Sequence, residues 1–133
     1  MVGVFKIKKK NNDFTAKVME LSGENINLCE QCGICTTSCP MADDMDITPS
    51  QIMHLVKIGD ESVLQTEAIW FCASCYSCTV RCPRGIDLSK VTEALRAMLL
   101  RKGINKVELE DIGEKEEEIP TIALVSISRK FTG

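Results

Sequence analysis

The sequence predicts a mainly α-helical domain, and two observations lead to this prediction. The first is an internal repeat, because the four cysteines of "CEQCGICTTSCP" (residues 29–40) recur after 43 residues in "CASCYSCTVRCP" (residues 72–83). The second is that a helical pattern follows each cysteine string, whereas residues 29–103 contain no convincing strand. A length of 133 residues suits one modest domain, or a core with tails.

The helix after the first string is predicted from its capping residues. Thr48 is a suitable N-cap, Pro49 fits the first helical position, and Gln51 completes a capping box. Gly59 is expected to end this helix, and a short second helix is expected over about residues 60–68. Its buried stripe is expected to consist of Ile52, Leu55 and Val56.

The helix after the second string is expected to begin at Asp87 or Ser89 and to stop at Gly103. Its apolar face would consist of Leu88, Val91, Leu95, Met98 and Leu99. One more amphipathic helix is expected upstream, carrying Phe14, Val18 and Leu21 and ending at Gly23.

Charge divides the chain into three segments. Residues 1–28 have a net charge of +2, residues 29–103 of −2, and residues 104–133 of −3. The expected organisation is an N-terminal segment with one helix (1–28), a cysteine domain (29–103) and an acidic C-terminal tail (104–133). The tail contains the β-prone run "IPTIALVSIS", which is expected either to pair with another subunit as a docking strand or to lie disordered behind the solvated run "EKEEE".

Composition excludes several partners and locations. The net charge is −3 without a broad basic face, which argues against nucleic acid. No run approaches the roughly 20 apolar residues that cross a bilayer. The N-terminal "MVGVFKIKKKNNDF" lacks the apolar core of a signal peptide, so a cytoplasmic location is expected.

Three kinds of chemistry compete for the eight cysteines. Disulfides are disfavoured in a reducing cytosol. Structural zinc uses paired C-x₂-C knuckles, but it does not need a third cysteine three residues on and a fourth before proline. The spacing C-x₂-C-x₂-C-x₃-C-P is instead the bacterial run that binds [4Fe–4S] clusters, and two complete copies favour two clusters.

In that run the fourth cysteine ligates the other cluster. Cluster one would therefore take Cys29, Cys32, Cys35 and Cys82. Cluster two would take Cys72, Cys75, Cys78 and Cys39. The alternative, in which each string supplies all four ligands of one cluster, requires the cysteine before proline to fold back on its own loop.

Other residues near the strings receive weaker interpretations. Gly33 is suited to a positive φ that lets a backbone N–H approach a sulfide, and Tyr76 is its counterpart in the second string. Trp70 and Phe71 are expected to pack in the core, and His54 to be exposed on a helix.

The strings and their flanks, "LSGENINLCEQCGICTTSCP" and "WFCASCYSCTVRCPRGIDL", resemble the small iron–sulfur C subunit of heterodisulfide reductase over about residues 15–103. The double motif alone is also similar to the iron–sulfur domains of succinate dehydrogenase, fumarate reductase, glycerol-3-phosphate dehydrogenase and glycolate oxidase. The helical insert between the strings resembles the alpha-helical ferredoxin fold. No plant-type C-x₄-C-x₂-C run and no Cys-Cys-Gly module is present, which is typical of a separate C subunit in the soluble complex.

The resemblance implies an electron-transfer subunit of an archaeal oxidoreductase complex used in methanogenesis, without a catalytic centre of its own. Electrons would pass from the flavin/iron–sulfur A subunit to the catalytic B subunit, which cleaves the coenzyme M–coenzyme B heterodisulfide, coupled to electron bifurcation. A hydrogenase or formate dehydrogenase would join in a larger complex. The alternatives are a fixed relay of another oxidoreductase complex and a free ferredoxin-like carrier.

Overall fold

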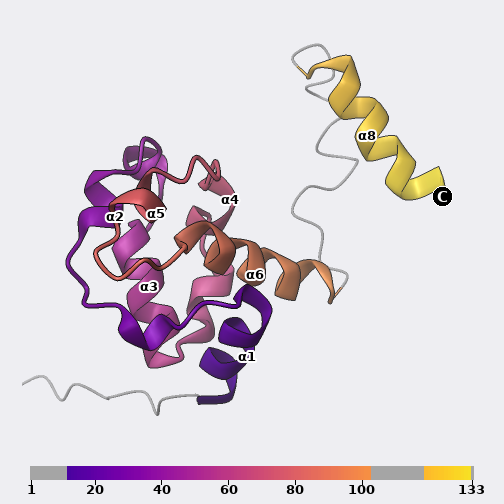
Figure 1. The fold of residues 1–133 in the computed structure, drawn as a ribbon. Coiled ribbons are helices and arrows are strands. Elements are labelled where there is room, and N and C mark those ends of the chain that lie inside the picture. The colour runs from indigo at the N-terminus through magenta and orange to yellow at the C-terminus, as the bar shows by residue number, and fades with distance from the viewer. Residues whose placement is uncertain (1–11, 103–118, 133) are drawn as a thin grey trace, which may run out of the picture. The chain divides into compact units, whose positions relative to one another are not determined.

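The structure is a computed structural model, and it describes residues 12–102 and 119–132. The chain divides into two units, residues 1–102 and residues 103–133. Within the described ranges all regular structure is helical, so the expected fold class, a mainly α protein, is confirmed. These helices are short, so much of the first unit consists of loops (Figure 1).

The helices of the first unit follow the order α1, α2, α3, α4, α5 and α6, with three 3₁₀ turns between them. Their bounds are α1 Asn12–Ser22, α2 Ile34–Thr37, α3 Pro49–Ile58, α4 Ala68–Phe71, α5 Ser77–Arg81 and α6 Leu88–Leu100. The 3₁₀ turns are η1 Ile26–Leu28, η2 Ala42–Asp44 and η3 Glu61–Gln65. The short helices α2 and α5 lie inside the cysteine strings, and the short helix α4 directly precedes the second string.

The core consists of aliphatic side chains from the long helices and the turns between them. Its most buried members are Val18, Ile26, Ile52, Val56, Val63, Ile69, Val91 and Leu95. Helix α1 packs on α3 and α6. Figure 1 shows α2 and α5 side by side, away from α1, and these two helices are in contact. The aliphatic core thus supports the cysteine loops from one side.

The predicted helix caps are largely confirmed. The Thr48 N–H donates to Gln51 Oε1 at 2.8 Å, and Gly59 ends α3 with φ of 76°. Asp87 rather than Ser89 is the N-cap of α6. Gly23 follows α1 with φ of 72°. These residues define the helix ends because they allow the unpaired backbone groups there to form hydrogen bonds. A side-chain acceptor does so at the N-terminus, and a residue with a positive φ does so at the C-terminus.

Several expectations need correction. Residues 60–68 do not form one helix, because η3 ends at Gln65 and the Thr66 hydroxyl donates to Val63 O at 2.7 Å before α4 begins. Helix α6 ends at Leu100, and Gly103, its expected stop, lies outside the described residues. Phe71 is 39% exposed and so is not a core residue. Leu55 is only half-buried, and Met53 takes its place in the core.

The second unit contains one described helix, α8, over Thr121–Thr132. The prediction of a strand in this segment is wrong, because backbone bonds from Ala123 and Leu124 to Pro120 O begin a helix instead. Alternating β-branched residues favour a strand only where a partner strand can pair with them. Ile122 and Val125 of α8 are 78% and 46% exposed.

Candidate metal centre

The two cysteine strings adopt the same backbone path. Gln31 and Ser74 are equivalent positions in the repeat, and both have a positive φ, of 58° and 52°. Gly33 and Tyr76 are also equivalent, with φ of 79° and 62°, and each precedes the short helix of its string. The positive φ expected at Gly33 is confirmed. These left-handed residues turn each string around a centre, so that its first three cysteines face the same space.

Two cavities lie where the strings meet. The first is lined by Cys29, Cys32, Cys35, Cys78 and Cys82 among its residues. The second is lined by Cys39, Cys72, Cys75 and Cys78 among its residues. Cys78 and Leu88 line both cavities, so a single wall separates them. Each string therefore contributes its first three cysteines to one cavity and its last cysteine to the other.

The remaining walls of the cavities are mostly apolar. Met53, Ile86 and Leu88 line the first cavity, and Met45, Ile52 and Leu88 line the second. Within residues 12–102 and 119–132, no three His, Cys, Asp or Glu side chains converge to hold a single metal ion. The cysteines line the walls of the two cavities.

Burial changes the thiols that face the cavities. It raises the pKa of Cys35 to about 11, with a further increase from the neighbouring Cys29, Cys78 and Cys32. Burial also raises the pKa of Cys78, the equivalent cysteine of the second string. The pKa of the exposed Cys75 is lowered, chiefly by hydrogen bonding with the Ser77 side chain. A thiolate at Cys35 or Cys78 therefore needs a bound metal to compensate its charge.

Two helix N-termini lie at the cavity walls, and at α6 the carboxylate of the N-cap Asp87 offsets the positive potential of the helix end. The first turn of α3 contributes Pro49 and Ser50 to the cavity walls, and the first turn of α6 contributes Leu88 and Ser89. Because the N-terminus of a helix carries a partial positive charge, it favours a negatively charged group beside it. A cofactor held by thiolates is such a group, so the residues present fit iron–sulfur clusters.

Equivalent hydroxyl groups fasten the short helices to the long ones. In the first repeat, Thr36 Oγ1 donates to Ser50 Oγ at 2.9 Å. In the second, Thr79 Oγ1 donates to Asp87 Oδ1 at 2.9 Å, and Asp87 Oδ1 also accepts from Ser89 N at 3.0 Å. Burial alone would raise the pKa of Asp87, but the hydrogen bonds from Ser89, Thr79 and Lys90 lower it.

A carboxylate connects the two halves. Asp46, in the segment between the strings, accepts hydrogen bonds from Glu67 N at 3.0 Å and Ala68 N at 2.7 Å. These are the first backbone donors of α4, the helix that leads into Cys72. The pKa of Asp46 is lowered by these backbone N–H groups, which outweigh the opposing effect of desolvation. Asp46 was not singled out from the sequence, because its partners are 21 and 22 residues away.

Three other residues were also missed by sequence reasoning. Gln31 Nε2 lies 3.3 Å from Cys29 Sγ. Lys57 and Arg96 donate to backbone carbonyls of the strings, as described below. His54, in contrast, lies exposed on α3 as expected.

The fold and the cavities define an iron–sulfur protein. Residues 9–86 match the family described as "4Fe-4S dicluster domain", and the chain belongs to this family. It therefore carries two [4Fe–4S] clusters, as the doubled motif predicted.

The relatives narrow the class further. The chain is 43% identical over 105 residues to the C subunit of ferredoxin:CoB-CoM heterodisulfide reductase from Methanosarcina acetivorans, covering 75% of this chain and 42% of the relative. It is 33% identical over 110 residues to the iron-sulfur C 2 subunit of CoB–CoM heterodisulfide reductase from Methanocaldococcus jannaschii, covering 77% and 59%. The C subunit of ferredoxin:CoB-CoM heterodisulfide reductase from Methanosarcina mazei is 34% identical over 98 residues, covering 74% and 61%.

The resemblance to the C subunit of heterodisulfide reductase is thus confirmed. The chain spans about half the length of the curated relatives it matches. Among the described residues, no helix is long and apolar enough to cross a membrane.

Proposed function

We propose that this chain relays single electrons inside a heterodisulfide-reductase complex. The observation that carries the proposal is the pair of cysteine-lined cavities that share Cys78 and Leu88 as a common wall. Two [4Fe–4S] clusters bound there would each accept and pass on one electron, and their closeness suits transfer between them. The named relatives, all C subunits of such complexes, support this role over that of a free ferredoxin-like carrier.

The ligands of each cluster are proposed to come from both strings. The first cluster would be held by Cys29, Cys32, Cys35 and Cys82, and the second by Cys72, Cys75, Cys78 and Cys39. The lining of the cavities supports this crossed arrangement, because Cys82 lies on the first cavity and Cys39 on the second. Cys78 lines both cavities, and it is assigned to the second together with its string neighbours.

The relatives are the basis for proposing the partner subunits of this chain. The flavin/iron–sulfur A subunit would supply electrons, and the catalytic B subunit would use them to cleave the coenzyme M–coenzyme B heterodisulfide. A hydrogenase or formate dehydrogenase would feed electrons into a larger assembly, in the cytoplasm. The exposed cysteines Cys32 and Cys75, one on each cavity, are the points at which electrons would enter and leave.

The chain itself is proposed to lack a catalytic centre. All eight cysteines of the sequence are required as ligands in the proposed arrangement, so no thiol remains to attack a substrate disulfide. A cluster with four protein ligands offers no open iron position to a substrate sulfur. His54 is exposed on α3 and lies on neither cavity, so it is not placed to act as a base there.

An anaerobic reconstitution tests the proposal. The isolated chain, with about eight iron and eight acid-labile sulfide atoms per chain, should accept electrons from a strong reductant and leave the heterodisulfide intact. Addition of the catalytic subunit should produce turnover, which Cys32→Ser or Cys75→Ser should abolish. Heterodisulfide reduction by the chain alone at the rate of the complex, or copurification with a different oxidoreductase, would contradict it. Binding to many redox proteins with no stable complex would favour the free carrier instead.

A further inference from the structure

In each cysteine string, a cationic side chain binds the backbone carbonyl of the first cysteine. Lys57 Nζ donates to Cys29 O at 2.6 Å, across 28 residues of sequence. Arg96 Nη2 donates to Cys72 O at 2.6 Å, across 24 residues. Both hydrogen bonds are partly buried. Cys29 lines the first cavity and Cys72 the second, so each cation binds the backbone of a cysteine on a different cavity.

The two cations occupy equivalent positions in the repeat. Lys57 is the ninth residue of α3, which begins at Pro49, and Arg96 is the ninth residue of α6, which begins at Leu88. The loops before these helices differ by four residues, because Thr48 follows Cys39 by nine residues and Asp87 follows Cys82 by five. Lys57 and Arg96 are therefore equivalent by their positions in the two packed helices. An alignment of the two repeats at the fixed period of 43 residues does not pair them.

A positive charge at this position has a specific electrostatic effect. A cluster becomes more negative by one charge when it accepts an electron, and a nearby cation stabilises that reduced state more than the oxidised state. Partial burial strengthens the interaction, because the effective dielectric constant is lower than in water. Reduction potentials of such clusters respond to net charge and to the residues around the ligands.

We propose that Lys57 and Arg96 are a matched pair of positioning residues, each of which raises the reduction potential of the cluster in the cavity lined by its cysteine partner. The proposal rests on the two clusters of the family and not on the heterodisulfide as substrate. Under both the crossed and the single-string ligation, Cys29 and Cys72 belong to different clusters. The two cations therefore act on different clusters in either case.

The pair is not symmetric in its chemistry. Among the described residues, the flexible ammonium group of Lys57 makes one hydrogen bond. Arg96 also donates from Nε to Ile69 O, and its guanidinium lies 6.0 Å from the centre of the Trp70 ring. A planar fork bound to two carbonyls and an aromatic ring is held in one place more firmly than an ammonium. Arg96→Lys therefore keeps the positive charge but holds the charged group less firmly in place.

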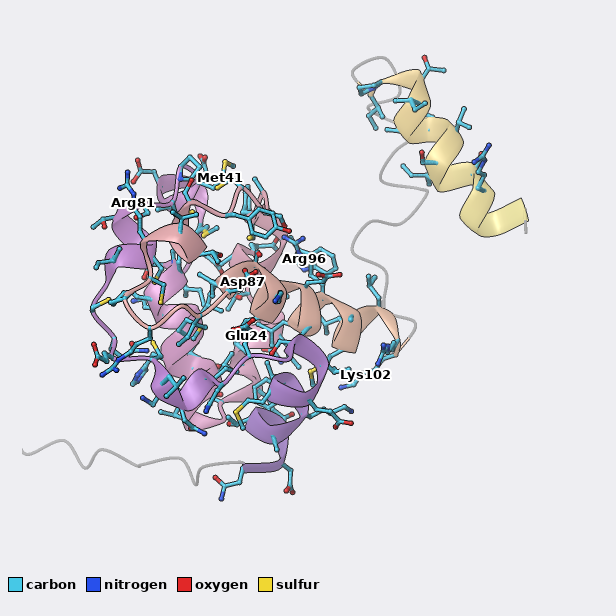
Figure 2. All side chains as sticks on the ribbon, viewed as in Figure 1. Glu24, Met41, Arg81, Asp87, Arg96 and Lys102 are labelled. Atoms are coloured by element: carbon cyan, nitrogen blue, oxygen red, sulfur yellow. The ribbon has the colours of Figure 1, made fainter. Side chains whose placement is uncertain are left out.

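Potentiometric titration of the full-length, cluster-loaded chain, followed by electron paramagnetic resonance, tests the proposal. Lys57→Met should lower the potential of one cluster, and Arg96→Met that of the other, each by about tenfold in the reduction equilibrium, or about 59 mV for one electron. Lys57→Arg and Arg96→Lys should each restore most of the potential. Figure 2 shows Arg96 on α6 and Lys102 at the far end of that helix, so Lys102→Met is a control of equal charge change.

Glutamine variants separate charge from hydrogen bonding, and they carry the test if the methionine variants fail to bind iron. Lys57→Gln and Arg96→Gln keep a donor for the carbonyl and remove the charge, so they should lower the same potentials. Unchanged potentials in the neutral variants, one cluster responding to both, or an equal shift in Lys102→Met would each overturn the proposal. Iron loss in every neutral variant, with iron retained in Lys57→Arg and Arg96→Lys, would show a purely structural role and also overturn it. None of these outcomes depends on heterodisulfide turnover.

Discussion

The first and second cysteine strings share a backbone and differ in side chains. Gln31 and Ser74, and Gly33 and Tyr76, are pairs of equivalent residues with the same left-handed φ but different side chains. Ile26 and Ile69, one turn before each string, are both fully buried. The backbone positions the cysteines and is repeated, whereas the side chains at these equivalent positions differ. Two sites of one geometry can therefore have different electronic properties.

The difference extends to the helix after each string. In the first repeat a neutral pair, Thr36 and Ser50, joins the short helix to the long one. In the second repeat a buried carboxylate, Asp87, takes this role and collects several donors at once. A negative charge thus lies at the N-cap of α6, whereas the N-cap of α3 is the neutral Thr48.

The largest expected effect comes from removing the single cysteine that each string is proposed to contribute to the other string's cluster. In the crossed arrangement, Cys39→Ser removes a ligand of the cluster near Cys72, and Cys82→Ser removes one from the cluster near Cys29. Each variant should lose one cluster, so that iron falls from about eight to about four atoms per chain. Iron analysis and paramagnetic resonance would identify the cluster that remains.

A useful control for this prediction is Cys35→Ser, which should affect the same cluster as Cys82→Ser. If Cys82→Ser instead matches Cys78→Ser, each string holds its own cluster, and the crossed arrangement is wrong.

A smaller effect is expected at the helix caps. Asp87→Ala should lower the free energy of unfolding by about 2 kcal/mol, because it removes an N-cap and leaves the Thr79 and Ser89 hydroxyls without their acceptor. Thr48→Ala, at the equivalent cap of α3, should cost only about 1 kcal/mol. Denaturant unfolding of the two variants under anaerobic conditions measures the difference.

The contribution of Asp87 should also depend on pH. Its pKa is lower in the folded chain than in the unfolded one. The stabilisation is therefore present above the unfolded pKa of about 3.9 and is lost as the pH falls through the folded value. Equal losses in Asp87→Ala and Thr48→Ala at neutral pH would show that the carboxylate adds nothing beyond an ordinary cap.

The next effect concerns the left-handed residues that precede α2 and α5. Gly33→Ala should cost about 1 kcal/mol, because an added Cβ meets no atom within 4 Å but φ of 79° is strained for any residue with a side chain. Tyr76→Gly should change stability by less than about 1 kcal/mol, since relief of that strain is offset by the larger freedom of glycine in the unfolded chain. Thermal unfolding that ranks these two variants in the opposite order would contradict this account.

The smallest expected effect on the clusters comes from the C-terminal unit. We propose that the tail, residues 104–133, docks on a partner, and the exposed Ile122 and Val125 of α8 supply an apolar surface for this. Deletion of residues 104–133 should leave the iron content unchanged and weaken binding to the partner subunits, measured by anaerobic copurification. Loss of iron after this deletion would show that the tail supports the cluster domain.

Local sequence features predicted much of this molecule. The caps at Thr48 and Asp87 were predictable because a capping residue and the backbone groups that it satisfies are only two or three residues apart. The two [4Fe–4S] clusters were predictable because their ligands follow a fixed spacing. The crossed ligation was also expected from that spacing, and it remains a prediction that the cavity lining supports.

Features that depend on distant contacts were not predictable. Lys57 and Arg96 reach carbonyls more than 20 residues away, and no local pattern distinguishes them from exposed cations. The left-handed φ of Gln31 and Ser74 was missed because neither residue type favours it. The segment around α8 has residues of high strand propensity, yet in the absence of a partner strand the local backbone bonds of a helix are formed instead.

The mixed lining of the cavities has a consequence for biosynthesis. Cys82 lies on the first cavity and Cys39 on the second, so neither cavity belongs to one half of the chain. A nascent polypeptide synthesised only as far as η3 cannot form either cavity completely, although it already contains half of the cysteines of the full chain. Under the proposed crossed ligation, maturation therefore has to wait for the second string, which completes the ligand sets of both clusters within the same few residues.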